Sequence, residues 1–523
     1  MSASREKHKL TRAAGVVGAA TLSSRVGGFV RDLVIAFFFG ASPAADAFFV
    51  AFRIPNLLRR LFAEGTLTIA FIPVFTEVLR QKGRQEAFLL ARSTYALLAL
   101  ALLAVCLAGE IFTPQVVRVM APGFTPGGET YRLAVELTRW CLPYIFFISL
   151  VALAGGVLNC LDHFFAPAVA PLLLNLSIIT ASFALSPYLD PPVLSLAAGV
   201  LLGGVAQLLF QVPFLRARGV GLLPAWDIKN PALLRIARLM GPAAFGAAVY
   251  QLTVFINTML ASLLPSGSVS YLYYADRLIQ FPLGIFAVAV STAVLPSLSR
   301  QAADGDTEAL VDTMGYGLRL ALFIVLPAMT GLLVLARPLV VLLFMRGQFT
   351  PADAAATAGA VAGYAAGLWG FAGVRSVVGA FYALKDTKTP VLVAAVCLLV
   401  NLALALVLMG PLLQVGLALA SSAAGVCNLA GLLWLLRRRL GRLGGRRIAR
   451  SLAGMSAASA VMALAVAAVA YLPDWGQETA QASRVLRPLA AVLCGGVVYL
   501  GAAWALGLAE LGELAQVIRR RRG

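Results

Sequence analysis

Long apolar stretches separated by short polar connections recur along the whole chain. A helix needs roughly 20 apolar residues to cross the hydrocarbon core of a membrane, and stretches of this kind, bounded by turn-forming residues, predict fourteen membrane spans. We place the spans near residues 12–40, 47–79, 86–109, 130–159, 166–187, 193–216, 240–264, 270–298, 315–336, 353–383, 389–409, 413–436, 451–471 and 487–509. Because no connection is long enough for a soluble domain, we expect an all-α polytopic membrane protein.

The composition supports this expectation. Of the 523 residues, 60% are hydrophobic and 12% are charged, and the mean hydropathy is +0.88, whereas a soluble domain is about 25% charged. The six cysteines lie in or beside apolar stretches without the spacing of metal ligands, and the chain has only two histidines. We therefore expect no metal and no other cofactor, although a coupling cation of unknown identity remains open.

The net charge of +19 is concentrated in every second connection. Lysine and arginine are abundant at 80–84, 216–218, 385–388 and 437–450 and at the C-terminal end, all on the same side in the predicted topology. By the positive-inside rule, this side and both termini are cytoplasmic, in a cytoplasmic (inner) membrane. The basic residues then face anionic lipid, so we do not expect a nucleic-acid partner.

The second half of the chain resembles the first half at one constant offset in residue number. Pro73 of the sequence AFIP corresponds to Pro296 of AVLP, Gly156 to Gly379, and Pro167 to Pro390. Many transporter folds contain such repeats, although chance matching of apolar sequences is the alternative. We expect an N-lobe at 1–223 with spans 1–6, a C-lobe at 224–446 with an interfacial helix at 227–240 and spans 7–12, and a C-terminal helix pair at 447–523.

Ionisable residues are concentrated in the first, second and eighth spans. At bilayer depth such residues usually face a bundle interior or a water-filled cavity. Helical spacing places one group of polar residues on a face of the first span and another on a face of the second, whereas Arg59 lies about 100° away from Arg60 on an ideal helix. The groups are Thr21, Ser24, Arg25, Gly28, Arg31 and Asp32 in the first span, Asp46, Arg53, Asn56, Arg60 and Glu64 in the second, and Tyr273, Arg277 and Gln280, beside Asp276, in the eighth. Spacing alone leaves open whether Arg59 or Arg60 faces inward.

The arginines of these spans indicate a site for an anion. Arg60 with Glu64 at i+4 can form an internal pair instead. For Arg25, Arg31 and Arg277 the spans contain too few acids, and a bundle rarely retains buried cations without a partner. Because the planar guanidinium binds phosphate oxygens bidentately, these arginines suit a pyrophosphate group.

Several motifs identify a family resemblance. They are SRVGGFVRD at 24–32, NLLRRLFAEG at 56–65, APGF at 121–124, YYADRL at 273–278 and FYALKDTKTPV at 381–391. Through them, and over nearly its full length, the sequence resembles the MurJ (MviN) lipid II flippases of the MOP exporter superfamily. The resemblance implies a V-shaped fold of two six-helix lobes around a cationic cavity, alternating access, and a groove on the last two helices for the polyprenyl tail.

The resemblance also assigns roles to residues. It implies substrate binding by Arg25, Arg31, Arg59 and Arg277, with Asp32, Asp46 and Glu64 as supporting acids. Ser24, Arg53, Arg60 and Asp276 complete our set of supporting or gating residues. Some relatives resemble sodium-coupled carriers with a carboxylate in the seventh span, where this chain has Asn257. Asp386 is the nearby alternative acid, so ion coupling through Asn257 or Asp386 remains open.

We therefore expect a transporter, not an enzyme, that moves lipid II from the inner to the outer leaflet for peptidoglycan synthesis. Its expected partners are lipid II, the bilayer and other cell-wall synthesis proteins. The alternative is a MOP carrier for a different lipid-linked oligosaccharide, whereas a cation-exporting drug carrier does not suit an arginine-rich cavity. An enzyme acting on the same lipid needs clustered acids, bases or a metal, and the outer loops contain only scattered acids.

Overall fold

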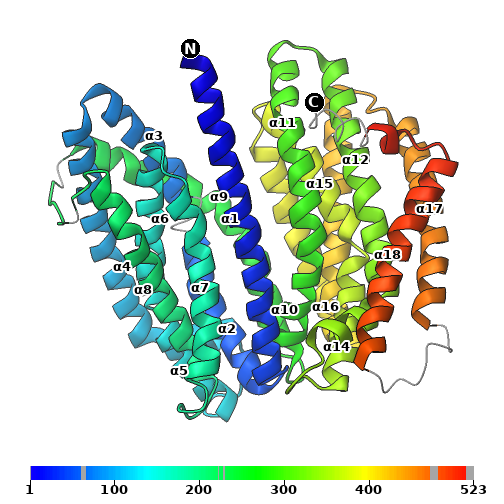
Figure 1. Cartoon of the computed structure of the whole chain (residues 1–523), viewed down its shortest axis with the longest axis horizontal. Coiled ribbons are helices and arrows are strands. Elements are labelled where there is room, and N and C mark those ends of the chain that lie inside the picture. The colour runs from blue at the N-terminus through cyan, green and yellow to red at the C-terminus, as the bar shows by residue number, and fades with distance from the viewer. Residues whose placement is uncertain (1, 61–65, 222, 228–229, 472–480, 514–523) are drawn as a thin grey trace. The chain divides into compact units, whose positions relative to one another are not determined.

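The computed structural model describes residues 2–60, 66–221, 223–227, 230–471 and 481–513 (Figure 1). All regular secondary structure in these ranges is helical. The chain divides into two compact units, Met1–Ser270 and Tyr271–Gly523. The all-α fold expected from hydropathy is therefore confirmed.

The first unit contains nine helices in the described part of the chain and the beginning of a tenth. They are α1 (Ser2–Phe39), α2 (Pro43–Arg59), α3 (Thr66–Gln81), α4 (Arg84–Met120), α5 (Glu129–Cys141), α6 (Tyr144–Cys160), α7 (Phe165–Ala184), α8 (Leu194–Ala217), α9 (Pro231–Ser262) and α10 (Ser268–Pro282). Figure 1 shows α4, α6, α7 and α8 running alongside one another, and α7 also packs against α1. A core that includes Phe71, Phe75, Leu90 and Leu153 joins α3, α4 and α6.

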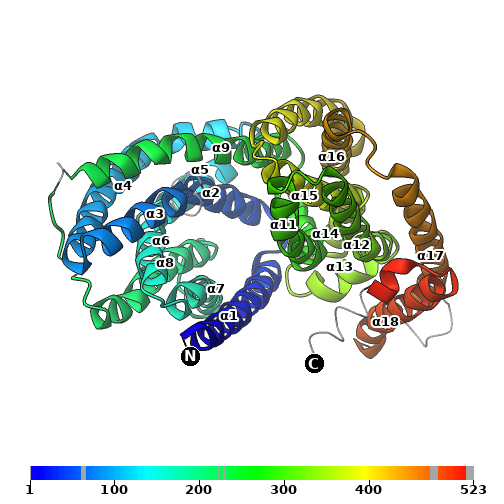
Figure 2. The same ribbon diagram turned by 90° about the horizontal axis from the view of Figure 1, so that it is seen from above.

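The second unit continues from α10 to the C-terminal helix pair. Its elements are the π-helical turn η2 (Leu283–Ala287), α11 (Val288–Ala303), α12 (Thr307–Val334), α13 (Ala336–Phe344), α14 (Pro351–Ala365), α15 (Leu368–Ala383), α16 (Lys388–Leu440), α17 (Gly445–Tyr471) and α18 (Gln481–Ala505). Figure 2 shows α17 and α18 side by side, and both pack on α12. Phe323 of α12, Met455 of α17 and Tyr499 of α18 belong to the shared core.

Within the ranges that the structure describes, each predicted span falls on a helix or on consecutive helices. Prolines or short turns divide several spans, so that α5 and α6, α10 and α11, and α14 and α15 each form one predicted span. The predicted connection between the eleventh and twelfth spans is a sharp turn inside α16, where Leu413 has φ 50° and ψ −131°. In the described part of the chain, eight helical segments are long and apolar enough by themselves to cross a membrane.

Three local predictions were wrong. The stretch 227–240 does not form a separate interfacial helix, because α9 runs without interruption from Pro231 to Ser262 and its first residues pack into the core with α3. The helix α4 continues to Met120, beyond the predicted end at 109. The short helix α13 occupies a stretch that was expected to be a loop. The lobe boundary at 223 and the separate C-terminal pair from 447 stay predictions.

The helix boundaries follow the predicted repeat. The starts of α4 at Arg84 and α12 at Thr307 are separated by the same offset as Pro73 and Pro296, and so are the starts of α7 at Phe165 and α16 at Lys388. In the turns that precede α7 and α16, Asp162 and Lys385 are related by this offset, and both have φ 58°. Chance similarity of apolar sequences would not reproduce these turns, so they support the repeat.

Candidate functional site

Arg31 is the central cation of the first unit. It lies in α1 and is 6% exposed. Its Nε and Nη2 atoms both donate to Oδ1 of Asp32, at 3.0 Å and 2.7 Å, and its Cζ lies 5.9 Å from the ring centroid of Phe52 in α2. Asp32 is fully buried. The expectation that Arg31 lacks a neutralising acid was therefore wrong, because Asp32 occupies the edge of the guanidinium that binds a phosphate bidentately.

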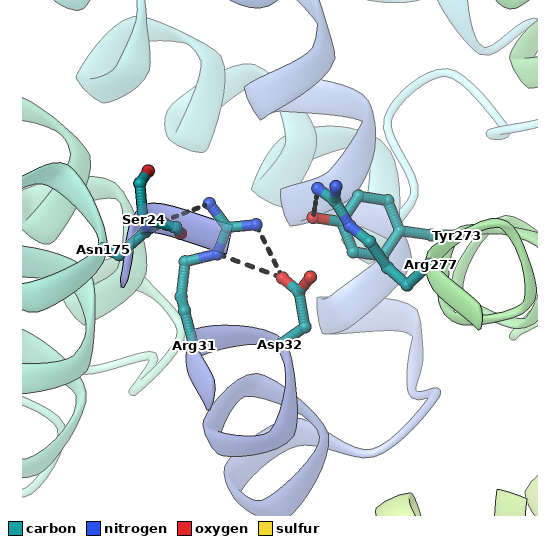
Figure 3. A network of polar contacts seen from close by, with 6 residues as sticks. All are labelled: Ser24, Arg31, Asp32, Asn175, Tyr273 and Arg277. Carbon is teal, nitrogen blue, oxygen red and sulfur yellow. Dashed lines mark hydrogen bonds and ion pairs between the residues drawn. The ribbon is translucent and has the colours of Figure 1, made fainter. Parts of the chain in front are cut away.

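Asn175 of α7 holds the other edge of this guanidinium. Figure 3 shows Arg31 between Asn175 on one side and Asp32 on the other. Arg31 Nη1 donates to Asn175 Oδ1 at 3.1 Å, and Asn175 Nδ2 donates to the carbonyl oxygen of Ser24 at 3.1 Å. Sequence analysis missed Asn175, because one asparagine in an apolar span has no local signal.

The two substrate arginines predicted in α1 lie in different environments. Arg25 is exposed, whereas Arg31 is buried. They are six positions apart, which separates them by about 120° around an ideal helix. The polar face predicted for α1 is thus wide enough to include both the buried Arg31–Asp32 pair and the exposed Arg25.

The charged residues of the second predicted span also differ from one another. Arg53 is half-buried and donates from Nη1 to Thr258 Oγ1 of α9 at 2.8 Å. Arg59 is half-buried at the end of α2, whereas Arg60 is exposed. The difference in burial fits the choice of Arg59 that the resemblance implied. Glu64 lies outside the described residues.

Asp46 contacts the beginning of α10. This carboxylate is 3% exposed and accepts hydrogen bonds from the backbone nitrogens of Gly267 and Ser270, at 2.6 Å and 2.8 Å. The APGF motif lies beside it, because Asp46 and Gly123 line the same cavity of about 210 Å³. A Cβ at Gly123 would come within 1.9 Å of the carbonyl oxygen of Ser262. The motif thus needs glycine where the loop touches the end of α9.

Arg277 is the candidate cation of the second unit. It is half-buried in α10, and its Nη2 donates to the hydroxyl of Tyr273 at 2.7 Å (Figure 3). Its Cζ also lies 4.8 Å from the centroid of the Tyr273 ring. Gln280 donates to Asp276 Oδ1 at 3.4 Å. The four-residue spacing predicted from sequence therefore brings these polar pairs together along α10.

The two candidate ion-coupling residues lie at different places in the chain. Asn257 is half-buried in α9, beside Thr258. Asp386 lies in the turn before α16, where it accepts hydrogen bonds from the backbone nitrogen and the hydroxyl of Thr389 and pairs with Arg439 at 2.9 Å. The hydrogen bonds from Thr389, helped by the Arg439 charge, lower the pKa of the Asp386 carboxyl. Among the described residues, no group of three or more histidine, cysteine or acidic side chains is arranged to hold a metal ion.

A second buried ion pair was also missed. The distance between Nη1 of Arg319, in α12, and Oε1 of Glu510 is 3.7 Å. The two side chains are 7% and 2% exposed. Ser451 of α17 donates to the same oxygen at 2.8 Å. This cluster joins α12, α17 and the segment after α18. Only long-range packing brings these three residues together, so their contact could not be predicted from sequence spacing.

Comparisons with known proteins agree on one family. The family model described as "Lipid II flippase MurJ" matches residues 35–480. A "Probable lipid II flippase MurJ" of Vibrio cholerae is 40% identical over 430 residues, which cover 81% of this chain and 82% of that protein. A "Lipid II flippase MurJ" of Burkholderia cenocepacia is 38% identical over 507 residues, covering 95% and 98%.

Solved structures show the same relationship at the level of the fold. A structure titled "Lipid II flippase MurJ, inward closed conformation" is 28% identical, with a TM-score of 0.78 and coverage of 93% of this chain and 97% of that chain. An inward-facing multidrug resistance MATE family transporter of the MOP superfamily has a TM-score of 0.62 at 15% identity, covering 82% and 95%. The second likeness concerns the fold alone.

Proposed function

Because this chain belongs to the MurJ family of lipid II flippases, we propose that four of its arginines bind the pyrophosphate of lipid II during transport. The chain is a multi-pass membrane protein with a MOP-type fold, and its function is to move lipid II across the membrane by alternating access. The observation that carries the assignment of the binding site is the Arg31–Asp32 pair, because two guanidinium nitrogens already contact a carboxylate inside the first predicted span.

The pair suggests how binding and release are balanced. Pyrophosphate carries several oxygens that match the Nε–Nη2 edge of Arg31. The substrate has to displace Asp32 from this edge, and the return of Asp32 favours release. A cation whose charge was not compensated inside the protein would be costly. Asp32 therefore stabilises the empty site and competes with the substrate in each cycle.

Other arginines complete the proposed set of head-group contacts. Exposed Arg25 is available for the first contact with the head group, whereas Arg59 and Arg277 are half-buried. The stacking of Arg277 on Tyr273 holds its guanidinium close to the α10 backbone. Following the resemblance, we assign these four arginines to the head group, and α17 and α18 to the polyprenyl tail.

The proposed direction of transport follows from the distribution of basic loops. By the positive-inside rule, we infer that both termini and the arginine-rich connection at 437–450 are cytoplasmic. In the inner membrane this orientation lets the transporter take lipid II from the inner leaflet and deliver it to the outer leaflet. Cell-wall synthesis proteins that use lipid II are the expected functional partners.

Membrane potential is a proposed driving force. Movement of a charge across the membrane is worth about 2.3 kcal/mol per 100 mV, and the head group is anionic. Flipping should therefore change with an imposed potential in vesicles, while exchange of sodium for potassium tests a coupling cation. A rate that is indifferent to both would reject electrical coupling and selective coupling to sodium.

The binding site can be tested with fluorescent lipid II in reconstituted vesicles. Arg31→Ala and Arg277→Ala should each reduce flipping about tenfold or more, because each removes a charged contact with phosphate. Arg235→Ala is a matched control, since this exposed arginine pairs with Glu77 on the surface at 2.8 Å. Wild-type flipping no faster than in empty vesicles would refute the function, and normal flipping by both variants would refute the site. Faster transport of another lipid-linked oligosaccharide would favour the alternative carrier.

A further inference from the structure

Asn175 is a buried amide with two polar contacts to α1. It is 6% exposed and lies near the middle of α7. Its oxygen accepts from Arg31 Nη1, and its nitrogen donates to the backbone carbonyl of Ser24, both at 3.1 Å. The amide thus connects the arginine to a backbone group two turns earlier in the same helix.

Gly27 of SRVGGFVRD packs closely against Leu172 of α7, about one turn before Asn175. A Cβ at Gly28 would lie 3.5 Å from Asn175 Nδ2, and a Cβ at Gly27 would lie 2.8 Å from Leu172 Cδ1. The small residues therefore allow α7 to pack against α1 at the level of Ser24 and Arg31. Asn175 is thus held by the packing of α7 on α1 and by its hydrogen bond to the Ser24 carbonyl, in addition to its contact with Arg31.

The guanidinium is held by different groups on its two edges. Asp32 accepts from Nε and Nη2, whereas Asn175 accepts from Nη1. Phosphate recognition by arginine commonly uses a two-nitrogen edge. A substrate phosphate can therefore replace Asp32 without displacing Asn175, which keeps the guanidinium plane in place during the exchange.

We propose that Asn175 is a positioning residue for lipid II transport: it anchors Arg31 through Nη1 so that the Nε–Nη2 edge alternates between Asp32 and the substrate phosphate. This inference rests on the proposed function, and it adds a specific requirement for a neutral side chain at position 175. A second carboxylate there would neutralise the arginine and exclude the phosphate. An apolar side chain would remove this acceptor from Nη1.

Asn175→Asp provides a test that loss of folding cannot imitate. Two carboxylates beside one buried arginine repel each other, so the pair should share a proton at low pH and lose it as the pH rises. Among the hydrogen bonds described above, the charged groups beside Asn175 are Arg31 and Asp32. From α8, the buried side chain of Gln207 donates to the Ala170 carbonyl of α7 and is neutral. The protonated form of the variant side chain would mimic the amide, whereas its ionised form would compete with the substrate.

The experiment measures initial flipping rates of fluorescent lipid II over a range of concentrations at about pH 5.5 and about pH 8, divided by the wild-type values at each pH. For Asn175→Asp we expect an apparent KM about tenfold above wild type at the higher pH and within about threefold at the lower pH. Asn175→Leu, of similar shape, should show a raised KM at both pH values.

Asn401→Asp is the matched control. Asn401 is a buried amide in α16, 2% exposed, whose nitrogen donates to Ser421 and not to an arginine. Ionisation of the introduced carboxyl can change the maximal flipping rate with pH, because burial disfavours its charge, but the apparent KM of this variant should stay within about threefold of wild type at both pH values. The inference fails if the Asn175→Asp variant has the wild-type apparent KM at both pH values. It also fails if the apparent KM is raised by the same factor at both. Wild-type flipping in the same vesicles shows separately whether the proposed function holds.

Discussion

Asp46 accepts two hydrogen bonds from Ser270, one from the backbone nitrogen at 2.8 Å and one from the hydroxyl at 2.5 Å. The same carboxylate accepts from the backbone nitrogen of Gly267. These groups lie at the beginning of α10, where the helix dipole favours a negative charge. An acid of α2 therefore stabilises the first turn of a helix that lies far from it in the sequence.

Asp46→Asn should lower the free energy of unfolding by about 1.5–3 kcal/mol, because the amide replaces a charged acceptor with a weaker one. Ser270→Ala should have a smaller effect, since it leaves both backbone donors with their acceptor. Thermal unfolding in detergent measures both variants. Equal stability of Asp46→Asn and wild type would show that the carboxylate charge contributes nothing to this contact.

Asp32→Asn should increase the affinity for lipid II while slowing its release. The substitution removes the negative charge that competes for the Nε–Nη2 edge of Arg31. We expect a lower apparent KM together with a lower maximal flipping rate, each by about tenfold or less. If KM rises instead, Asp32 supports binding and does not compete with the substrate.

The Arg319–Glu510 pair should respond unequally to single and double substitution. Removing one partner, as in Glu510→Gln, leaves a buried charge without compensation and should destabilise the protein by about 3–5 kcal/mol. Arg319→Met combined with Glu510→Leu should recover most of this loss, because an apolar pair suits the surrounding core of α12, α17 and α18. Unfolding of the single and double variants in detergent gives the comparison. If the double variant loses as much stability as the two single substitutions combined, the result contradicts a buried ion pair.

Asp386→Asn should show a pH-dependent loss of stability. Hydrogen bonds from Thr389 and the charge of Arg439 lower the folded-state pKa of this carboxyl below its ordinary value of 3.8. The ionised side chain therefore stabilises the fold above that ordinary value, and this contribution is lost as the pH falls through the lower folded value. Because water screens the contact, the difference between variant and wild type should be about 1 kcal/mol or less at neutral pH and should shrink below about pH 4. A constant difference would exclude the carboxylate charge as its cause.

Much of the fold could be predicted because its determinants are local. Apolar stretches of membrane-spanning length, turn residues and basic loops each act over a short part of the chain. The constant repeat offset was visible in a few shared residues, and it recurs in the turns at Asp162 and Lys385. The continuation of α9 through 231–240 was not predicted, because its amphipathic pattern also suits a helix at the membrane surface.

Local sequence patterns were sufficient to identify the class of the protein and the helices that carry charge, and the family motifs implied Arg59 in preference to Arg60. The partners of these charges became visible in the packed helices. Asn175 contacts Arg31 from a different helix, and Glu510 reaches Arg319 from the segment after α18. Helical periodicity shows which face a residue occupies, but helix packing decides which distant side chain meets it. For this reason the arginines could be found from the sequence, whereas the amide that positions Arg31 could not.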